Sequence, residues 1–181
     1  SESKFTHFEF LTLMAAWLFY SGETIPPVQR AIFEVGLGGT WDATNAIPHQ
    51  ICIISSLSYD HQNFLGNSLP EIASNKFGIV TPKSLVVHSP LPKEVQTIAL
   101  STQESTQSQW IESKPFSLHI EQHRKQNGKQ NGKQNSKQDL EQESDPQFFI
   151  DTQWGRAQLS LPGMRAAENA ATALTMLSEL G

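Results

Sequence analysis

The sequence predicts an α/β fold, a three-layer arrangement of a mostly parallel sheet flanked by helices, with an appended antiparallel hairpin. Up to about residue 105, short runs rich in β-branched and aromatic residues alternate with helical patterns, as in sheets with crossover helices. After that the runs are short and of alternating or mixed polarity, which favours antiparallel pairing. With 181 residues, 38% of them hydrophobic, the chain can bury one ordinary core. Residues 1–181 are therefore predicted to be one domain or a piece of one.

The first elements are a helix and two strands. Apolar residues recur at helical spacing over residues 5–20, and Thr6 is placed to cap this helix, which we expect to be amphipathic and packed on a sheet. The runs "AIFEVGL" (31–37) and "HQICIISSL" (49–57) are bounded by Gly, Pro, Asn and Ser. Both are predicted to be buried parallel strands.

The next elements continue the alternation. Residues 67–79 are predicted to form a helix with Ser68 as its cap and Gly78 after its end. "SLVVHS" (84–89) is a third strand, and 90–102 a further helix with a proline near its start. This order predicts a doubly wound arrangement for the first part of the chain.

The remaining strands are assigned to the antiparallel hairpin, and a helix follows them at 165–180. The predicted strands are 109–113, 115–122, 146–153 and 155–161. Residues 122–146 form a low-complexity insertion with a repeat resembling KQNG, too polar to bury surface that would offset its ordering entropy. Acidic residues follow its lysines at once, so we expect a disordered, solvated hairpin tip rather than a basic patch.

Composition excludes several classes of protein. The formal net charge is −5 with no basic stripe, which argues against a nucleic-acid partner. The single cysteine, Cys52, lies in an apolar run and cannot form a disulfide within one chain, which fits a reducing cytoplasm. The longest apolar stretch, residues 8–20, is too short to cross a bilayer and contains Glu9. A cytoplasmic protein without a membrane partner is predicted.

Candidate chemistry lies at predicted strand ends. Glu34 falls late in one strand, and Asp60 and His61 follow the next, so we expect these groups to meet at the carboxyl edge of the sheet. Glutamate is a hard oxygen ligand suited to Mg²⁺, whereas histidine is a less usual one. The plain alternatives are a solvent-facing rim glutamate and a surface histidine. No G-x-x-x-x-G-K-[ST] phosphate loop occurs in the chain.

Three stretches carry a resemblance to a known family. "EVGLGGTWDATN", "ISSLSYDHQNFLGNSLPEIASNKFGIVTP" and "VVHSPLP" resemble successive central-domain motifs of the folylpolyglutamate and dihydrofolate synthase family, within the Mur ligase superfamily. "THFEF" and "GMRAAENAATAL" resemble further segments of that family. Thr40 and Trp41 stand where the family often has arginine and leucine, and Arg165 and Ala166 replace its usual His-Gln pair. The resemblance implies a P-loop NTPase-like central domain.

The activity that the resemblance implies is ATP-dependent formation of an amide bond. ATP would phosphorylate the carboxylate of a folate or dihydropteroate, and the amine of L-glutamate would attack the acyl phosphate. By the same resemblance Glu34 would bind one Mg²⁺ and His61 a second, while Lys76 would be carbamylated to support that second metal. The alternative for Lys76 is a surface lysine that ends a helix.

Two further roles follow from the resemblance. Asp42 and Ala43 match the loop that contacts the pterin in dihydrofolate synthases, where a carboxylate can accept hydrogen bonds from ring N–H groups. Asn169 matches an asparagine that pairs with adenine, although a capping or packing role is equally compatible with its sequence position.

The family's phosphate loop should precede residue 1 and its C-terminal domain should follow residue 181. The chain is thus expected to be a fragment, inactive alone and a monomer when full length, whose partners are folate or dihydropteroate, L-glutamate and ATP. Two alternatives stay open. One is a degenerate, non-catalytic remnant that acts as a binding or structural module. The other is a Mur-type ligase for a different amino acid and carboxylate.

Overall fold

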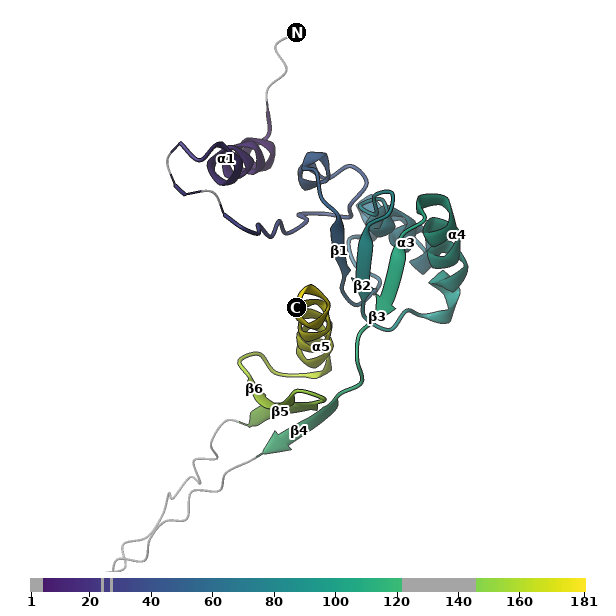
Figure 1. Cartoon of the computed structure of the whole chain (residues 1–181). Coiled ribbons are helices and arrows are strands. Elements are labelled where there is room, and N and C mark those ends of the chain that lie inside the picture. The colour runs from purple at the N-terminus through teal and green to yellow at the C-terminus, as the bar shows by residue number, and fades with distance from the viewer. Residues whose placement is uncertain (1–4, 24, 27, 122–145) are drawn as a thin grey trace, which may run out of the picture. The chain divides into compact units, whose positions relative to one another are not determined.

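The computed structural model describes residues 5–23, 25–26, 28–121 and 146–181. The predicted insertion, 122–146, therefore lies outside the described residues except for its last position. The chain divides into two compact units, Ser1–Glu112 and Ser113–Gly181 (Figure 1). None of the helices in the described ranges combines the length and apolar character needed to cross a membrane.

The first unit is built on a parallel sheet with the strand order β1-β2-β3. Its strands are β1 (Ile51–Ile54), β2 (Leu85–His88) and β3 (Gln109–Glu112). Cys52 pairs with Val86, and Val86 with Trp110, so the middle strand is covered on both edges. The helices of this unit are α1 (His7–Ser21), η1 (Ala43–Ala46), α2 (Gln62–Leu65), α3 (Leu69–Phe77), η2 (Lys93–Val95) and α4 (Gln96–Thr106).

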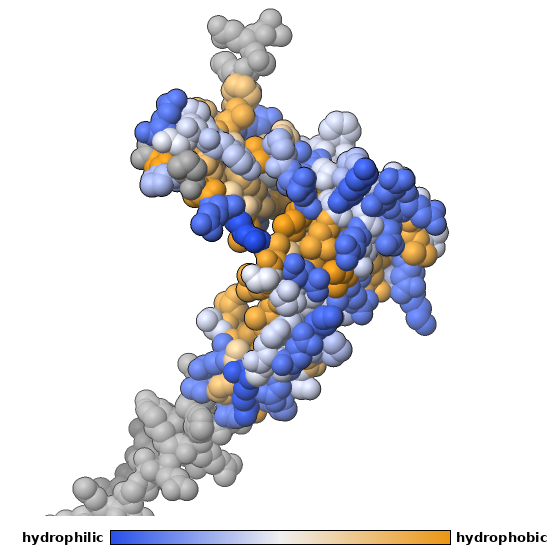
Figure 2. Space-filling model, in the orientation of Figure 1, coloured by the Kyte–Doolittle hydropathy of each residue, from blue (hydrophilic) through white to orange (hydrophobic). Residues whose placement is uncertain are grey.

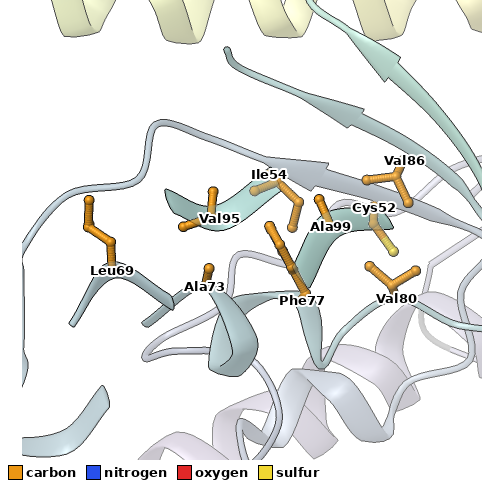
Figure 3. Close-up of a cluster of buried hydrophobic side chains, with 9 residues drawn as sticks. All are labelled: Cys52, Ile54, Leu69, Ala73, Phe77, Val80, Val86, Val95 and Ala99. Carbon is orange, nitrogen blue, oxygen red and sulfur yellow. The ribbon is translucent and has the colours of Figure 1, made fainter. Parts of the chain in front are cut away.

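The core of this unit lies between the sheet and the helices α3 and α4. Figure 3 shows nine buried side chains converging there; they are Cys52, Ile54, Leu69, Ala73, Phe77, Val80, Val86, Val95 and Ala99. The Phe77 ring meets Trp110 edge to face, with centroids 5.2 Å apart. The side chain of Ser68 accepts a hydrogen bond from Glu71 N, and Gly78 ends α3, so both predicted caps are confirmed.

Helix α1 is confirmed, but its surroundings differ from the prediction. Thr6 and Glu9 form a reciprocal capping box, which satisfies two backbone donors at the helix start. Most of the large apolar side chains of α1 are exposed, and hydrophobic residues show at its surface in Figure 2. Within its unit α1 lies against η1 and Phe33 rather than on the sheet. The helix is apolar around most of its circumference, so the spacing of apolar residues alone did not define one packing face.

Two strand predictions are wrong. Residues 31–37 form no strand, because within the described residues this segment pairs with no other strand. Residues 109–112 do form a strand, β3, but it joins the parallel sheet instead of the antiparallel hairpin. The short, half-exposed pattern of β3 resembled an antiparallel strand, whereas its position after the crossover helix α4 makes it parallel.

The second unit contains the antiparallel part of the fold and a long helix. Its sheet has the order β4-β5-β6, so three strands are present rather than a hairpin on the parallel sheet. The strands are β4 (Ser117–Glu121), β5 (Gln147–Thr152) and β6 (Gly155–Leu159). Helix α5 (Met164–Leu180) confirms the last prediction, and the Lys114 N–H donates to Thr175 Oγ1 of this helix at 2.9 Å. An α/β fold with a parallel and an antiparallel sheet is thus confirmed.

Candidate functional site

The loop of residues 36–45 is organised around the carboxylate of Asp42. Oδ2 accepts hydrogen bonds from the N–H groups of Gly36 and Leu37, both at 3.0 Å. Oδ1 accepts from Thr44 N at 2.9 Å and from Thr44 Oγ1 at 2.6 Å. A carboxylate has about four lone-pair sites, so these donors occupy its acceptor capacity. The loop is therefore held in one shape despite its three glycines.

The same loop is fastened to the end of α3. Thr40 donates to the backbone oxygen of Asn75 twice, from its N–H at 2.9 Å and from its hydroxyl at 3.0 Å. The Asn45 side-chain amide donates to the oxygens of Thr40 at 3.2 Å and Gly78 at 3.1 Å. Asn45 thus bridges the loop and the end of the helix.

Close backbone approach explains one of the loop glycines. A Cβ added at Gly39 would lie 2.8 Å from Asn75 O and 2.9 Å from Lys76 O, which are backbone atoms at the end of α3. Real Cβ atoms do not approach backbone oxygens so closely, so the docked loop requires glycine at this position. The glycine-rich sequence thus serves packing as well as turning.

Beside this loop lies a concavity of about 320 Å³, which we call the loop pocket. Asp42 and Ala43, both predicted to contact a pterin, line it. Three aromatic side chains from three different segments also line it; they are Phe8, Trp41 and Phe64. The volume falls within the range of small-molecule sites, which begins at about 300 Å³.

Helix α1 contributes a charged group to the loop pocket. The Glu9 carboxylate accepts the Thr6 N–H at 2.7 Å, and this backbone hydrogen bond, with that from the Thr6 side chain, lowers the pKa of Glu9. Glu9 and Asp42 thus place two carboxylates in the lining of a pocket that also has aromatic rings. Such a lining suits a flat ring that carries N–H donors.

The structure places the predicted metal ligands outside the loop pocket. Glu34 is exposed, and its carboxylate makes no hydrogen bond or ion pair with any described residue. His61 precedes α2 in a left-handed conformation, with φ at 50°, and its Nε2 lies 3.8 Å from Asp60 Oδ1. Asp60 also accepts the His61 N–H at 2.8 Å, so this acid orients the backbone of the histidine.

Lys76 and Asn169 complete the predicted set. Lys76 is half-buried in the last turn of α3, whereas Asn169 is exposed on α5 in the other unit. In the parts of the chain that the structure describes, no three His, Cys, Asp or Glu side chains are grouped so that they could hold a metal. Asp42 and Ala43, which are neighbours in the chain, both line the loop pocket, whereas among the described residues no such cluster surrounds Glu34 or His61.

Several residues of the loop pocket were not singled out from the sequence as ligand contacts. Phe8 and Glu9 lie in the predicted helix 5–20, Phe64 lies in a stretch named only for the resemblance, and Trp41 was noted only as a departure from the family. A bulky aromatic residue within a glycine-rich loop is a signal that could have identified Trp41, because such a residue has little room to be buried there.

No family model matches the chain. Among curated proteins, the chain is 33% identical over 106 residues to the folylpolyglutamate synthase of Lacticaseibacillus casei, covering 59% of the chain and 24% of that protein. It is 51% identical over 75 residues to that of Arabidopsis thaliana, covering 41% and 12%. It is 45% identical over 74 residues to a dihydrofolate synthase/folylpolyglutamate synthase of Mycobacterium tuberculosis, covering 41% and 14%.

Solved structures agree with these relatives. A folylpolyglutamate synthase complex with AMPPCP, an ATP analogue, and folate matches 98% of the chain with a TM-score of 0.71 and 27% identity. The Mycobacterium tuberculosis folylpolyglutamate synthase complexed with ADP and AMPPCP matches 97% with a TM-score of 0.67 and 26% identity. The chain spans 39% and 37% of these structures, so it corresponds to well under half of their length.

Proposed function

Because the chain is homologous to part of the folylpolyglutamate/dihydrofolate synthase family, we propose that it forms part of an ATP-dependent ligase that joins L-glutamate to a folate or a dihydropteroate. The observation that carries this proposal is the loop pocket, where Asp42 and Ala43 lie together among three aromatic rings. Its volume of about 320 Å³ lies near the lower end of the range of small-molecule sites. The pocket would hold the pterin end of the substrate.

Asp42 has two tasks in this proposal. Its carboxylate shapes the loop through the contacts with Gly36, Leu37 and Thr44. A ring N–H of the pterin would have to share one of these oxygens with a backbone donor, since both oxygens are already engaged. Ala43, with its small side chain, leaves room for the ring edge beside this carboxylate.

The remaining site residues have proposed roles toward ATP and Mg²⁺. The exposed Glu34 carboxylate, which has no partner among the described residues, fits a hard divalent cation. We assign a second Mg²⁺ to His61 with a carbamylated Lys76, and adenine recognition to Asn169. Bound ATP would supply the phosphoryl group that activates the substrate carboxylate, and Mg²⁺ would offset the phosphate charge.

The proposal is tested by Glu34→Gln in a ligase of full family length that carries residues 1–181. We expect ADP release that depends on folate and glutamate to fall about 100-fold or more, because the amide is a poorer Mg²⁺ ligand. The matched control is Glu94→Gln, which changes another exposed glutamate of the same unit and should keep its turnover.

Three substrates separate the proposal from its alternatives. Turnover with tetrahydrofolate or dihydropteroate supports the folate ligase, whereas turnover with a muramyl substrate alone supports another Mur-type ligase. Binding of a folate without ADP release would favour a non-catalytic module. Unchanged turnover of the Glu34→Gln enzyme would remove Glu34 from the reaction.

A further inference from the structure

Trp41 stands out by its exposure. It is 92% exposed, although tryptophan is normally among the more buried residue types, and it lines the loop pocket. Its chain neighbours are fixed: Thr40 donates to Asn75 O, and the Asp42 N–H donates to Gly39 O at 3.1 Å. The backbone beneath the indole is thus held in place while the ring projects into solvent. Because the backbone is already held, covering the ring with a ligand has to order only the two side-chain torsions of the indole.

The three aromatic side chains of the loop pocket differ in their surroundings. The Phe8 ring packs on Gly36, since a Cβ added there would lie 2.8 Å from Phe8 Cζ. Phe64 is 76% exposed on α2. Neither Trp41 nor Phe64 pairs with another ring in the described part of the chain, although other rings do so, as Phe77 and Trp110 illustrate. The Phe8 ring is therefore already packed against Gly36, whereas the Trp41 and Phe64 rings are available to contact a ligand.

We propose that Trp41 stacks on a planar aromatic ring of the pteroyl substrate and so sets the affinity of the loop pocket, with Phe64 as a second apolar contact. The inference rests on the proposed function, since that function supplies the aromatic substrate. Stacking suits this place because the indole offers a large rigid face next to carboxylates that accept N–H groups. A folate contains two such rings, the pteridine and the aminobenzoyl ring, and both could lie on an indole face.

The test measures binding to the 181-residue chain by isothermal titration calorimetry. The probes are folic acid, pterin-6-carboxylate and p-aminobenzoyl-L-glutamate. We expect Trp41→Ala to weaken folic acid binding about tenfold or more, and Trp41→Phe, which keeps a stacking ring, to stay within about threefold. The control is Trp154→Ala, which removes another exposed tryptophan from the other unit and should bind as the unchanged chain does. The thermal unfolding midpoint of each variant is measured as well, to check that the substitution has not unfolded the chain.

The outcomes separate this inference from the function on which it rests. The probe whose binding is weakened by Trp41→Ala contains the ring that stacks on the indole. If Trp41→Ala binds folic acid as tightly as the unchanged chain while Asp42→Asn does not, the pocket stands and the role of Trp41 is overturned. If the unchanged chain binds none of the three probes, the stacking role and the pterin pocket are overturned together.

Discussion

The stretch 31–45 contains two regions that behave in opposite ways. Residues 31–35 are rich in β-branched and aromatic side chains, yet they form no strand, and Ile32 is 89% exposed. Residues 36–45 contain three glycines, yet hydrogen bonds accepted by Asp42 and donated by Thr40 and Asn45 fix the loop internally and against the end of α3. Local order here follows the partners that the backbone finds, and not the intrinsic flexibility of the residues.

The physical reason lies in what each preference requires. A strand preference expresses how well a side chain packs on a half-buried pleated surface, so it has no effect where no strand lies alongside. The glycine loop instead offers backbone N–H groups to one carboxylate and one helix end, and each satisfied donor removes a way for the loop to move. This difference can be tested by breaking each region in turn.

The largest effect is expected for Gly39→Ala. The new Cβ would press on the backbone oxygens of Asn75 and Lys76, which cannot rotate away. We expect the free energy of unfolding to fall by about 1–3 kcal/mol, as for overpacking in a filled site. Urea unfolding followed by tryptophan fluorescence measures it, since Trp110 packs on Phe77 in the core of the same unit. The control is Ala46→Ser, which adds one atom at an exposed position near the loop and should leave the free energy of unfolding unchanged. If the Gly39→Ala and Ala46→Ser variants are equally stable, the loop does not pack tightly on the end of α3.

A smaller effect is expected at Asp42. Asp42→Ala removes the acceptor of Gly36, Leu37 and Thr44, and we expect a loss of about 1–2 kcal/mol because the sites are partly open to water. Asp42→Asn keeps one acceptor oxygen and should lower the free energy of unfolding by less than Asp42→Ala does. Amide hydrogen exchange provides the sharper measurement, with faster exchange at these three N–H groups alone. Exchange rates that stay as they were would mean that other contacts hold the loop.

The smallest effect is expected in the other region. Ile32→Thr should change the free energy of unfolding by no more than about 0.5 kcal/mol, since the side chain is almost fully exposed. Ile72→Thr is the matched control, because Ile72 is fully buried on α3 and the same exchange should cost about 2 kcal/mol or more. A large loss at Ile32, measured by urea unfolding, would reveal a packing partner and reverse the contrast between the two regions.

The helices α1, α3, α4 and α5 were predictable because their signals are local. Thr6 with Glu9, and Ser68 with Glu71, are N-terminal capping arrangements whose members lie three residues apart in the sequence. Strand pairing is not local, so the partner of β3 and the lack of a partner for residues 31–37 could not be obtained from the pattern of those segments.

The candidate site was named from the resemblance, and the contacts of its residues with a ligand stay predictions. The resemblance identified Asp42 and Ala43, which do line one pocket, but it did not indicate that the Asp42 carboxylate also holds its own loop. The exposure of Trp41 and Phe64 depends on how α1, the loop and α2 meet, and periodicity does not encode that arrangement. The roles of Glu34, His61, Lys76 and Asn169 toward ATP and metal stay predictions.

The single cysteine of the chain has a practical consequence. Cys52 is 3% exposed in the first unit, its thiol donates to Ile79 O, and burial raises the pKa of this thiol. Transient opening of the core would return the pKa of the Cys52 thiol to its ordinary value and expose the thiol to alkylating reagents. The rate of Cys52 alkylation therefore reports the transient opening of the unit Ser1–Glu112 and not that of the other unit. Since the folded pKa is the higher one, this group's contribution to stability is complete below the ordinary thiol pKa and declines as the solution becomes more alkaline.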